Sequence, residues 1–227
     1  MSRFGAVVAA RTGSSRLPGK ALLPLGGRPM ILFLLERIRA TREACAVIFA
    51  TTTLPEDDEL ARVVGDAGYP VFRGANEDVV RRYVDAAKAY ELDYVVRITG
   101  DCPFVDAETL DYCLMSAHRH APYDLASTKG RFPVGIDYEI YRATVMAELH
   151  ASAKLDAADR EHLTLFMYKN PDLFKLVALE PSPAWRSTRV FTVDTSGDYL
   201  VAQEIVKRFA SNNFTIAELV NHTSYAD

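Results

Sequence analysis

Three cations stand close together near the start of the chain, in the segment AARTGSSRLPGK at residues 9–20. They are Arg11, Arg16 and Lys20, and the same segment holds Gly13, Ser14 and Gly19. Glycine lets a backbone approach a ligand closely, serine donates hydrogen bonds, and fixed cations neutralise negative charge. The combination predicts a binding site for a chain of phosphates. It matches neither GxxxxGK[ST] nor GxGxxG, and a solvated basic loop is the alternative interpretation.

Two aspartates follow apolar runs much later in the chain. Asp101 comes after residues 93–98, and Asp194 comes after residues 189–193. Ligands of open α/β sheets bind beyond the carboxyl ends of the strands, so we expect both carboxylates at the same sheet edge as the basic segment. Two carboxylates with open positions beside phosphates suit Mg²⁺, which takes few protein oxygens and keeps water and phosphate oxygens. A helix N-cap is the alternative role for each aspartate on its own.

The elements that must position these residues alternate between strands and helices in the first half of the chain. Apolar runs predict strands at 4–10, 46–52, 70–73 and 93–98, and helical periodicity predicts helices that begin near 29, 55, 76 and 106. The first helix is expected to expose Glu36, Arg37 and Arg39, and Asn76 is expected to cap the third. Residues 21–27 should form a short extended piece with a turn. This alternation predicts an α/β fold with a largely parallel sheet covered on both faces.

The second half of the chain is less regular. Strands are expected at 124–127, 136–141, 174–179 and 189–193, and helices at 143–151, 156–168, 197–209 and 215–220. We interpret this half as completing the main sheet and adding a cap or dimerisation arm within residues 123–185. No internal repeat or long linker interrupts the pattern, so the prediction is a single domain spanning residues 1–227.

Length, charge and cysteine usage exclude several classes of protein. A chain of 227 residues with 49% hydrophobic content can bury one substantial core. The net charge of -4 argues against nucleic-acid or membrane-surface binding, although residues 1–42 carry eight Lys or Arg and one acid. Cys45, Cys102 and Cys113 are odd in number without CxxC spacing, which favours neither disulfides nor zinc and indicates a reducing cytoplasm. No signal peptide or membrane span is predicted, because the apolar stretch at 30–35 is too short.

The basic segment resembles a known family signature. RTGSSRLPGK is similar to the RxGSxRLPGK motif of sugar-acid cytidylyltransferases, in particular the spore-coat polysaccharide branch, and to the nucleotide loop of the 3-deoxy-manno-octulosonate and acylneuraminate enzymes. Four further blocks, RGANEDVVRRY, RITGDCP, GIDYEIY and REHLT, resemble blocks of the spore-coat branch in the same order. The resemblance implies a Rossmann-like, three-layer αβα nucleotidyltransferase fold of GT-A-like type, with a mixed, mostly parallel central sheet.

The resemblance also implies roles for individual residues. Catalytic roles fall to Arg11, Lys20, Asp101 and Asp194, and the two aspartates would bind Mg²⁺. The nucleotide, CTP, would contact Arg11, Gly13, Ser14, Arg16, Lys20, Arg73, Asp78, Arg82 and Asp101, with Tyr83 nearby. The sugar substrate would contact Asp137, Glu139, Arg160 and His162, with Glu161 in the same block. The family further implies a homodimer that activates sugars for surface polysaccharide biosynthesis.

The expected reaction is attack of a sugar hydroxyl on the α-phosphate of CTP, with pyrophosphate leaving. Such chemistry needs positioning and charge neutralisation more than a covalent nucleophile. Two departures from the family pattern concern specificity: Val134 stands where the branch commonly has an acid, and the glutamine- and serine-containing stretch that reads cytosine in the octulosonate enzymes is missing. Three alternatives stay open: a nucleotide-sugar-dependent glycosyltransferase, a guanylyltransferase for molybdopterin, and a non-catalytic nucleotide-binding protein.

Overall fold

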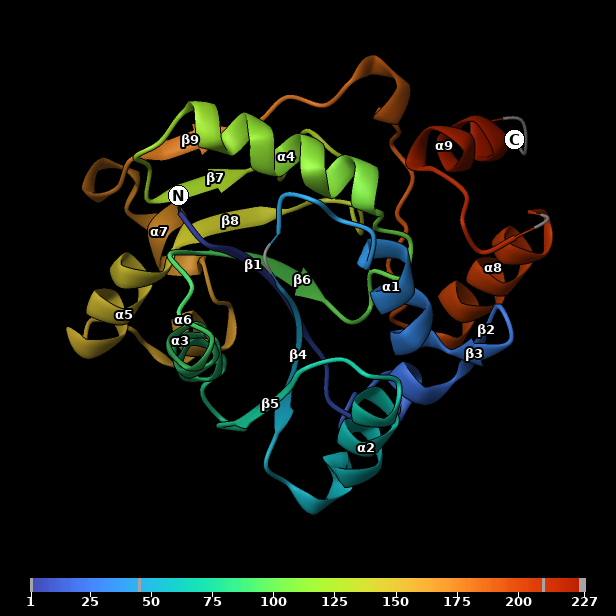
Figure 1. Ribbon diagram of the computed structural model, residues 1–227, viewed down its shortest axis with the longest axis horizontal. Helices are drawn as coiled ribbons and strands as arrows, with labels where there is room; N and C mark the ends of the chain where they lie inside the picture. Colours follow the sequence, from blue (N-terminus) through green and yellow to red (C-terminus); the bar gives the residue numbers. More distant parts are fainter. Residues whose placement is uncertain (1, 45, 210, 225–227) are drawn as a thin grey trace.

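The computed structural model describes residues 2–44, 46–209 and 211–224, and within these ranges seven strands form one central sheet (Figure 1). The strand order is β5-β4-β1-β6-β8-β7-β9. Their bounds are β1 Phe4–Ala9, β4 Ala46–Thr52, β5 Val71–Gly74, β6 Tyr94–Thr99, β7 Leu125–Ser127, β8 Glu139–Arg142 and β9 Leu176–Ala178. Neighbours from β5 to β6 pair in parallel, β8 is antiparallel to both β6 and β7, and β9 is parallel to β7. The predicted α/β fold with a mixed, mostly parallel sheet is therefore confirmed.

The central strands are apolar on both sides because helices cover both faces of the sheet. In β1, Phe4, Ala6 and Val8 belong to one buried cluster, whereas Val7 belongs to another. The same alternation recurs in β6, where Val96 and Val95 lie in opposite clusters. Successive side chains of a strand point to opposite faces, so each strand supplies both cores at once.

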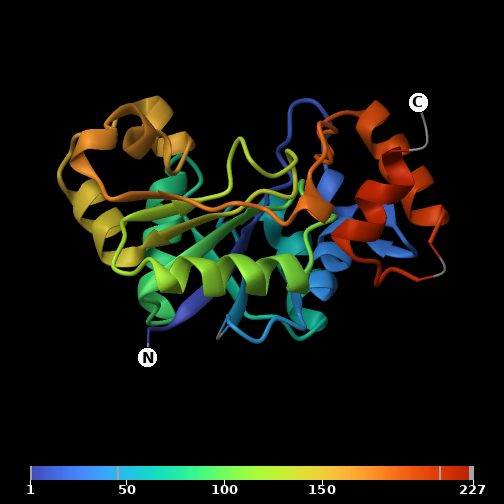
Figure 2. The ribbon, with the colours of Figure 1, turned by 90° about the horizontal axis from the view of Figure 1, so that it is seen from above.

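Two sets of helices complete the three layers. The first core takes buried side chains from α1 Met30–Ile38, α2 Asp58–Asp66, α4 Ala107–Arg119, α8 Ser196–Lys207 and α9 Ile216–Ser224. The second takes them from α3 Val79–Ala89, α5 Ala143–Ala151 and α7 Leu165–Lys169, and the short α6 Ala157–Glu161 lies between the last two in the chain. Figure 2 shows α8 and α9 (red) at one end of the sheet and the α5–α7 region (yellow to orange) at the other. No helix among the described residues is long and apolar enough to cross a lipid bilayer.

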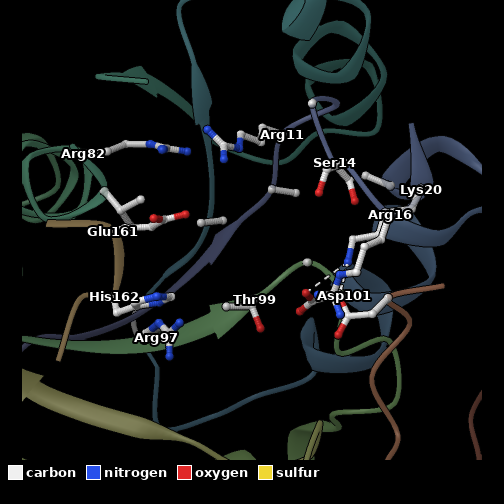
Figure 3. A pocket seen from close by; sticks show the side chains of 18 of the residues that line it. Arg11, Ser14, Arg16, Lys20, Arg82, Arg97, Thr99, Asp101, Glu161 and His162 are labelled. Carbon is white, nitrogen blue, oxygen red and sulfur yellow. Dashed lines mark hydrogen bonds and ion pairs between the residues drawn. The ribbon is translucent and has the colours of Figure 1, made fainter. Parts of the chain in front are cut away.

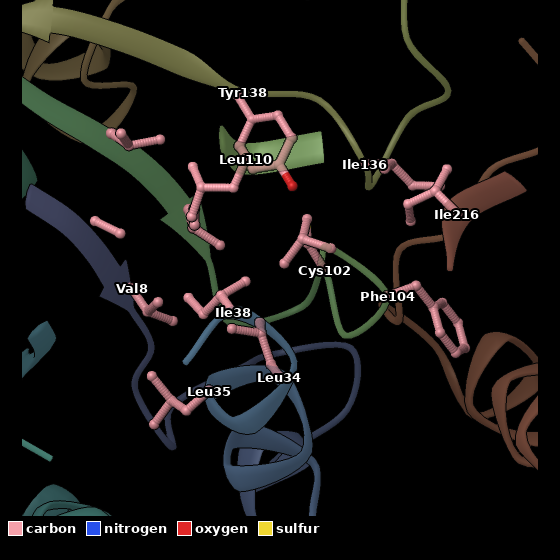
Figure 4. Close-up of a cluster of buried hydrophobic side chains, with 14 of the residues drawn as sticks. Val8, Leu34, Leu35, Ile38, Cys102, Phe104, Leu110, Ile136, Tyr138 and Ile216 are labelled. Carbon is pink, nitrogen blue, oxygen red and sulfur yellow. The ribbon is translucent and has the colours of Figure 1, made fainter. Parts of the chain in front are cut away.

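The first core joins the sheet to the segment that follows β6. Figure 4 shows Leu34, Leu35 and Ile38 of α1 beside Val8 of β1, with Phe104 and Ile216 on the far side of the cluster. Cys102 and Cys113 are free thiols buried in this core, and Cys45 lies outside the described residues.

Arg37 was expected to face solvent, and this prediction is wrong. Its side chain is buried, with 5% of the residue exposed. The guanidinium donates to the carbonyl oxygens of Phe104 at 3.0 Å, Val105 at 3.2 Å and Asn212 at 2.8 Å. It also lies 4.2 Å from the ring centroid of Phe214. Burial lowers the pKa of Arg37 to about 10. The helical period places position 37 one turn from Leu34, on the core side, and backbone carbonyls supply the acceptors that a buried arginine needs.

Three other local predictions need correction. Residues 189–193 do not form a strand; they are held by single bonds from Phe191 N to Val134 O and from Val193 N to Asp101 O, each 2.8 Å. The helix expected at 156–168 is divided into α6 and α7, because His162 adopts φ −108 and ψ 79. Asp78 rather than Asn76 caps α3. The short extended piece and turn expected at 21–27 are present: after a 3-10 turn, Lys20–Leu22, the strand β2 Pro24–Leu25 pairs with β3 Arg28–Pro29 across the turn at 26–27.

The region 123–185 completes the sheet as expected. It contributes β7, β8 and β9 to the sheet. Its helices α5–α7 lie between β8 and β9 in the chain, and α5 and α7 supply side chains to the second core. Its additional role as a cap or dimerisation arm stays a prediction.

Candidate active site

A cavity of about 430 Å³ opens where β1 and β6 end (Figure 3). Its wall includes Ala9 and Ala10 at the end of β1, and Thr99 and Gly100 at the end of β6. Residues 11–20 of the basic segment form a second wall of the cavity, and the first turns of α3 form a third. Parallel strands bring their carboxyl ends to one edge, which explains why segments distant in sequence meet here.

Lys20 lies at the centre of an ion-pair network at one end of this cavity. Its Nζ is 3.1 Å from Asp101 Oδ2 and 2.9 Å from Asp194 Oδ1, and it donates to Val193 O at 2.8 Å. Arg16 Nη2 lies 2.8 Å from the same Asp194 oxygen. The Lys20 side chain is 13% exposed, whereas that of Arg16 is 64% exposed. The basic segment and the two aspartates therefore meet in one place.

The position of Asp101 depends on close backbone packing around it. A Cβ at Gly100 would come within 2.6 Å of the Ala10 Cβ, so only glycine lets the ends of β1 and β6 approach this closely. Asp101 O accepts the bond from Val193 N that brings Asp194 to the site. Burial opposes ionisation of Asp101, but the charge of Lys20 and hydrogen bonds outweigh it and leave the Asp101 pKa below its usual value. This carboxylate is thus ionised at neutral pH.

Asp57 fixes the start of the basic segment, a role that the sequence analysis did not predict. Its carboxylate is fully buried and accepts from Thr12 N at 2.7 Å, from Thr12 Oγ1 at 2.8 Å and from Thr52 Oγ1. Thr12 O in turn accepts from Gly19 N at 2.9 Å, which closes the segment into a compact loop. Burial alone would raise the pKa of Asp57, but these hydrogen bonds hold it below its usual value. An acid at the start of a helix gave no sequence signal for this role.

The other end of the cavity carries Arg82, Arg97, Glu161 and His162 (Figure 3). Arg97 was not predicted; the only signal was a cation inside the apolar run 94–98. Its Nη1 lies 2.6 Å from Oε2 of Glu139, which is buried behind it. Burial alone would lower the pKa of Arg97, but the charge of Glu139 outweighs it, so the pKa stays above its usual value and the guanidinium keeps its charge.

The residues predicted to contact the nucleotide divide into two groups. The cavity wall includes Arg11, Gly13, Ser14, Arg16, Lys20, Arg82 and Asp101, as well as the nearby Tyr83. Arg73 and Asp78 are not among the residues that line it. Arg73 donates to Thr52 O at 2.9 Å and to Leu54 O at 3.0 Å, and so ties β5 to the chain after β4. Asp78 accepts from Arg81 N at 2.7 Å and caps α3.

Of the four residues predicted to bind the sugar, only His162 lines the cavity. Arg160 forms an ion pair with Asp78 at 2.5 Å, and His150 contacts the same Asp78 carboxylate. Asp137 accepts from Gly135 N at 3.0 Å. Glu139 does not line the cavity, but it pairs with Arg97, which does. The fourth sequence block therefore reaches the cavity through Glu161 and His162, whereas Asp137, Glu139 and Arg160 are engaged with other residues of the protein.

The donor set at Asp101 and Asp194 fits a hard divalent cation. Both carboxylates direct an oxygen at the same point in space, where Lys20 Nζ lies. Among the described residues, no group of three or more His, Cys, Asp or Glu side chains could hold a metal ion. Two carboxylates with further positions left to water and phosphate oxygens match the requirements of Mg²⁺ rather than those of a structural zinc.

Comparisons with known proteins agree with the fold. A family model described as Cytidylyltransferase matches residues 6–216. Spore coat polysaccharide biosynthesis protein SpsF of Bacillus subtilis is 33% identical over 198 residues, covering 85% of this chain and 82% of that protein. The solved structure of a cytidylyltransferase from Leptospira borgpetersenii superposes with a TM-score of 0.92 at 30% identity, covering 100% of this chain and 95% of that one. CMP:2-keto-3-deoxy-manno-octonic acid synthetase, solved with CTP, has a TM-score of 0.72 at 19% identity, covering 91% and 99%, a likeness of fold alone.

Proposed function

The chain belongs to the cytidylyltransferase family, and from this premise we propose that it transfers the cytidylyl group of CTP to a hydroxyl of a sugar acid. The observation that supports this best is the convergence of Lys20, Asp101 and Asp194 at the carboxyl ends of β1 and β6. SpsF, a relative similar over most of its length, is named for spore coat polysaccharide biosynthesis, which favours a product used in surface polysaccharide.

In the proposed reaction an oxygen of the acceptor hydroxyl attacks the α-phosphorus of CTP. A new P–O bond forms to the sugar, the bond from the α-phosphorus to the bridging oxygen breaks, and pyrophosphate leaves with that oxygen. The hydroxyl proton passes to solvent. Transfer of this kind depends on alignment of the two oxygens and on neutralisation of charge, so no covalent intermediate with the protein is required.

The basic segment supplies the neutralisation. Arg11, Arg16 and Lys20 would hold the β- and γ-phosphates and stabilise the charge that develops on the leaving pyrophosphate. Gly13 and Ser14 line the same wall and would donate backbone and hydroxyl hydrogen bonds to phosphate oxygens. Asp57 keeps this loop in shape through Thr12, so the cations are positioned before the nucleotide binds.

Asp101 and Asp194 would hold Mg²⁺, which when bound supplies charge neutralisation at the α-phosphate and lowers the pKa of the attacking hydroxyl. Removal of the Lys20 contact from one or both carboxylates would free their oxygens for the ion. His162, at the other end of the cavity, would contact the sugar. The proposal also includes a cytoplasmic site of action. It further includes a homodimer with residues 123–185 at the contact between subunits, and light scattering, which measures the molar mass in solution, tests whether the dimer forms.

Nucleotide selectivity separates the proposal from its rivals. The protein is incubated with each of the four nucleoside triphosphates, Mg²⁺ and a panel of 2-keto sugar acids and sugar phosphates, and pyrophosphate is measured. Release with CTP, accompanied by a CMP-sugar in the mass spectrum, is the expected result. Preference for GTP or UTP would overturn the proposal. A glycosyltransferase would instead consume a nucleotide sugar and release no pyrophosphate, and a non-catalytic protein would bind CTP without turnover.

A further inference from the structure

Arg97 is a charged side chain in the middle of an otherwise apolar strand. It lies two residues before Thr99 in β6, and because side chains two apart share a face, both line the cavity. Its side chain is 26% exposed, whereas that of its partner Glu139 is 3% exposed. A buried ion pair is an expensive way to stabilise a sheet, since apolar side chains of similar size do so at lower cost. Its presence at the cavity therefore points to a binding role.

One side of the Arg97 guanidinium is held rigidly. Nη1 donates to Glu139 Oε2 at 2.6 Å, and the second oxygen of Glu139 accepts from Thr164 Oγ1 at 2.7 Å. The carboxylate cannot rotate without breaking one of these bonds, so it holds the Nη1 end of the guanidinium in place. Arg97 is thus oriented in advance of any ligand.

The other side of the guanidinium is unused. Among the described residues, Arg97 Nε has no hydrogen-bond partner although it is buried. Nε belongs to the side edge of the guanidinium, with which arginine grips two oxygens of a carboxylate or phosphate. An N–H without a partner is costly in a buried position, and an anionic ligand at this edge would remove that cost.

The other cations of the cavity are already engaged. Arg82 Nε donates to Ala75 O at 3.0 Å, so its side edge holds the loop before α3. Arg11 Nη1 contacts Asn76 Oδ1 at 3.3 Å, and Arg16 and Lys20 pair with Asp194. Arg97 also lies at the end of the cavity opposite to Asp101 and Lys20 (Figure 3). A phosphate chain on the basic segment would leave Arg97 without a phosphate to bind, and we take its ligand to be the acceptor.

We propose that Arg97 binds the anionic group of the acceptor sugar through its Nε edge, and that Glu139 is the residue that positions it. The inference rests on the proposed function, because it takes the occupant of this end to be the acceptor. It restricts the acceptor to sugars that carry a carboxylate or a phosphate, and it replaces the direct sugar contact predicted for Glu139 with an indirect role. Glu161 and His162, which face the same end, would contact neutral parts of the sugar.

The test compares acids with their neutral counterparts. The probes are 3-deoxy-manno-octulosonate, N-acetylneuraminate and their methyl esters for the carboxylate, and a sugar phosphate with its parent sugar for the phosphate. The NMR resonance of the Arg97 Nε–H is followed during titration of each probe into the CTP-bound protein. An acid is expected to shift this resonance and its ester is not. Absence of a shift with every acid and phosphate would overturn the inference.

The variant Arg97→Gln measures the size of the effect. Wild type should prefer an acid to its ester by about 10- to 100-fold in KM, and Arg97→Gln should lose this preference while its KM for CTP stays unchanged. Arg142→Gln is the matched control, since Arg142 of β8 also pairs with a carboxylate, Asp124, but does not line the cavity. A retained preference for the acid in Arg97→Gln would contradict the inference.

Two further measurements separate loss of acceptor binding from poor folding and from failure of the proposed function. If Arg97→Gln folds poorly because Glu139 is left unpaired, the double variant Arg97→Gln/Glu139→Gln removes the charged pair together and should still lose the preference. Pyrophosphate release is recorded separately from the resonance shift. A shift without pyrophosphate contradicts the proposed function alone, whereas pyrophosphate release with a neutral sugar and no shift contradicts only the role of Arg97.

Discussion

Lys20 Nζ and Asp194 Oδ1 lie 2.9 Å apart, although the two residues are separated by 174 positions in the sequence. This contact lies at the end of the cavity that the basic segment lines, and Asp101, at the end of β6, also pairs with Lys20. Two carboxylates and two cations, Lys20 and Arg16, balance one another there. Removal of Lys20 leaves the partly buried Asp101 without a cation, so variants at this position should affect both the chemistry and the local structure.

Lys20→Met should lower kcat with CTP by about 100- to 1,000-fold, because it removes the partly buried cation that we propose to stabilise the leaving pyrophosphate. The KM for CTP should rise as well. Lys207→Met, at an exposed lysine that pairs with Glu204, is the control and should keep normal activity. Steady-state pyrophosphate release measures both. A kcat within threefold of wild type in Lys20→Met would show that this cation is not needed in the transition state.

Asp101→Asn and Asp194→Asn should each abolish turnover while CTP binding largely survives. The amides keep the size of the side chains but lose the charge that would attract Mg²⁺. Turnover as a function of Mg²⁺ concentration and CTP binding by calorimetry are the measurements. Asp66→Asn, on the exposed surface of α2, is the control and should not change the dependence on Mg²⁺. Near-normal activity in either active-site variant would mean that its carboxylate does not hold the metal.

The sheet and much of the site were predictable because local pattern and tertiary role agree there. Apolar runs such as 4–9 and 94–99 are strands whose two faces are both covered, and residues that follow such strands gather at one edge by topology alone. The meeting of the basic segment with Asp101 follows from this rule. The meeting with Asp194 was also expected, although the chain before it is not a strand.

The failures come from contacts that no local pattern encodes. Residues 189–193 resemble a strand in composition, but they are positioned by Val134 O and Asp101 O, which belong to segments far away in sequence. Arg37 lies on the core side of α1, but the carbonyl oxygens that make its burial possible come from the distant segment after β6. Asp78 and Arg160 carry charges suited to ligand binding, yet they pair with each other. A charged residue acquires its role from the partner that the fold supplies, and the sequence does not state that partner.

Gly135→Ala should destabilise the protein and disturb Asp194 at the same time. Gly135 adopts φ +90, and a Cβ there would lie 2.7 Å from the Phe191 C and Thr192 N atoms, which belong to the backbone leading to Asp194. Strain and overlap together should cost about 2–4 kcal/mol in the free energy of unfolding. Gly130→Ala is the matched control: it has φ +75 but open space around it, and should cost about 1–2 kcal/mol. Denaturant unfolding gives both values, and equal losses would refute the importance of the contact.

Asp57 should give the protein a part of its stability that depends on pH. Its folded pKa lies below the usual value of 3.8, because hydrogen bonds from Thr52 and Thr12 outweigh the effect of burial. A pKa that is lower in the folded protein than in the unfolded chain means that folding stabilises the ionised carboxylate of Asp57. The contribution is therefore fully present above the pKa of the unfolded chain and is lost as pH falls through the folded pKa.

The comparison of wild type with Asp57→Asn isolates this contribution, since the other carboxylates titrate in both proteins. The difference between their free energies of unfolding should be constant from about pH 7 to pH 5 and should narrow below about pH 4. Urea unfolding at half-unit pH intervals measures it, and Asp66→Asn on exposed α2 serves as the control. A difference that stays constant down to about pH 2 would place the stabilisation in packing rather than in charge. Because Asp57 holds Thr12, the variant should also raise the KM for CTP at neutral pH, where the loop that carries the cations loses its anchor.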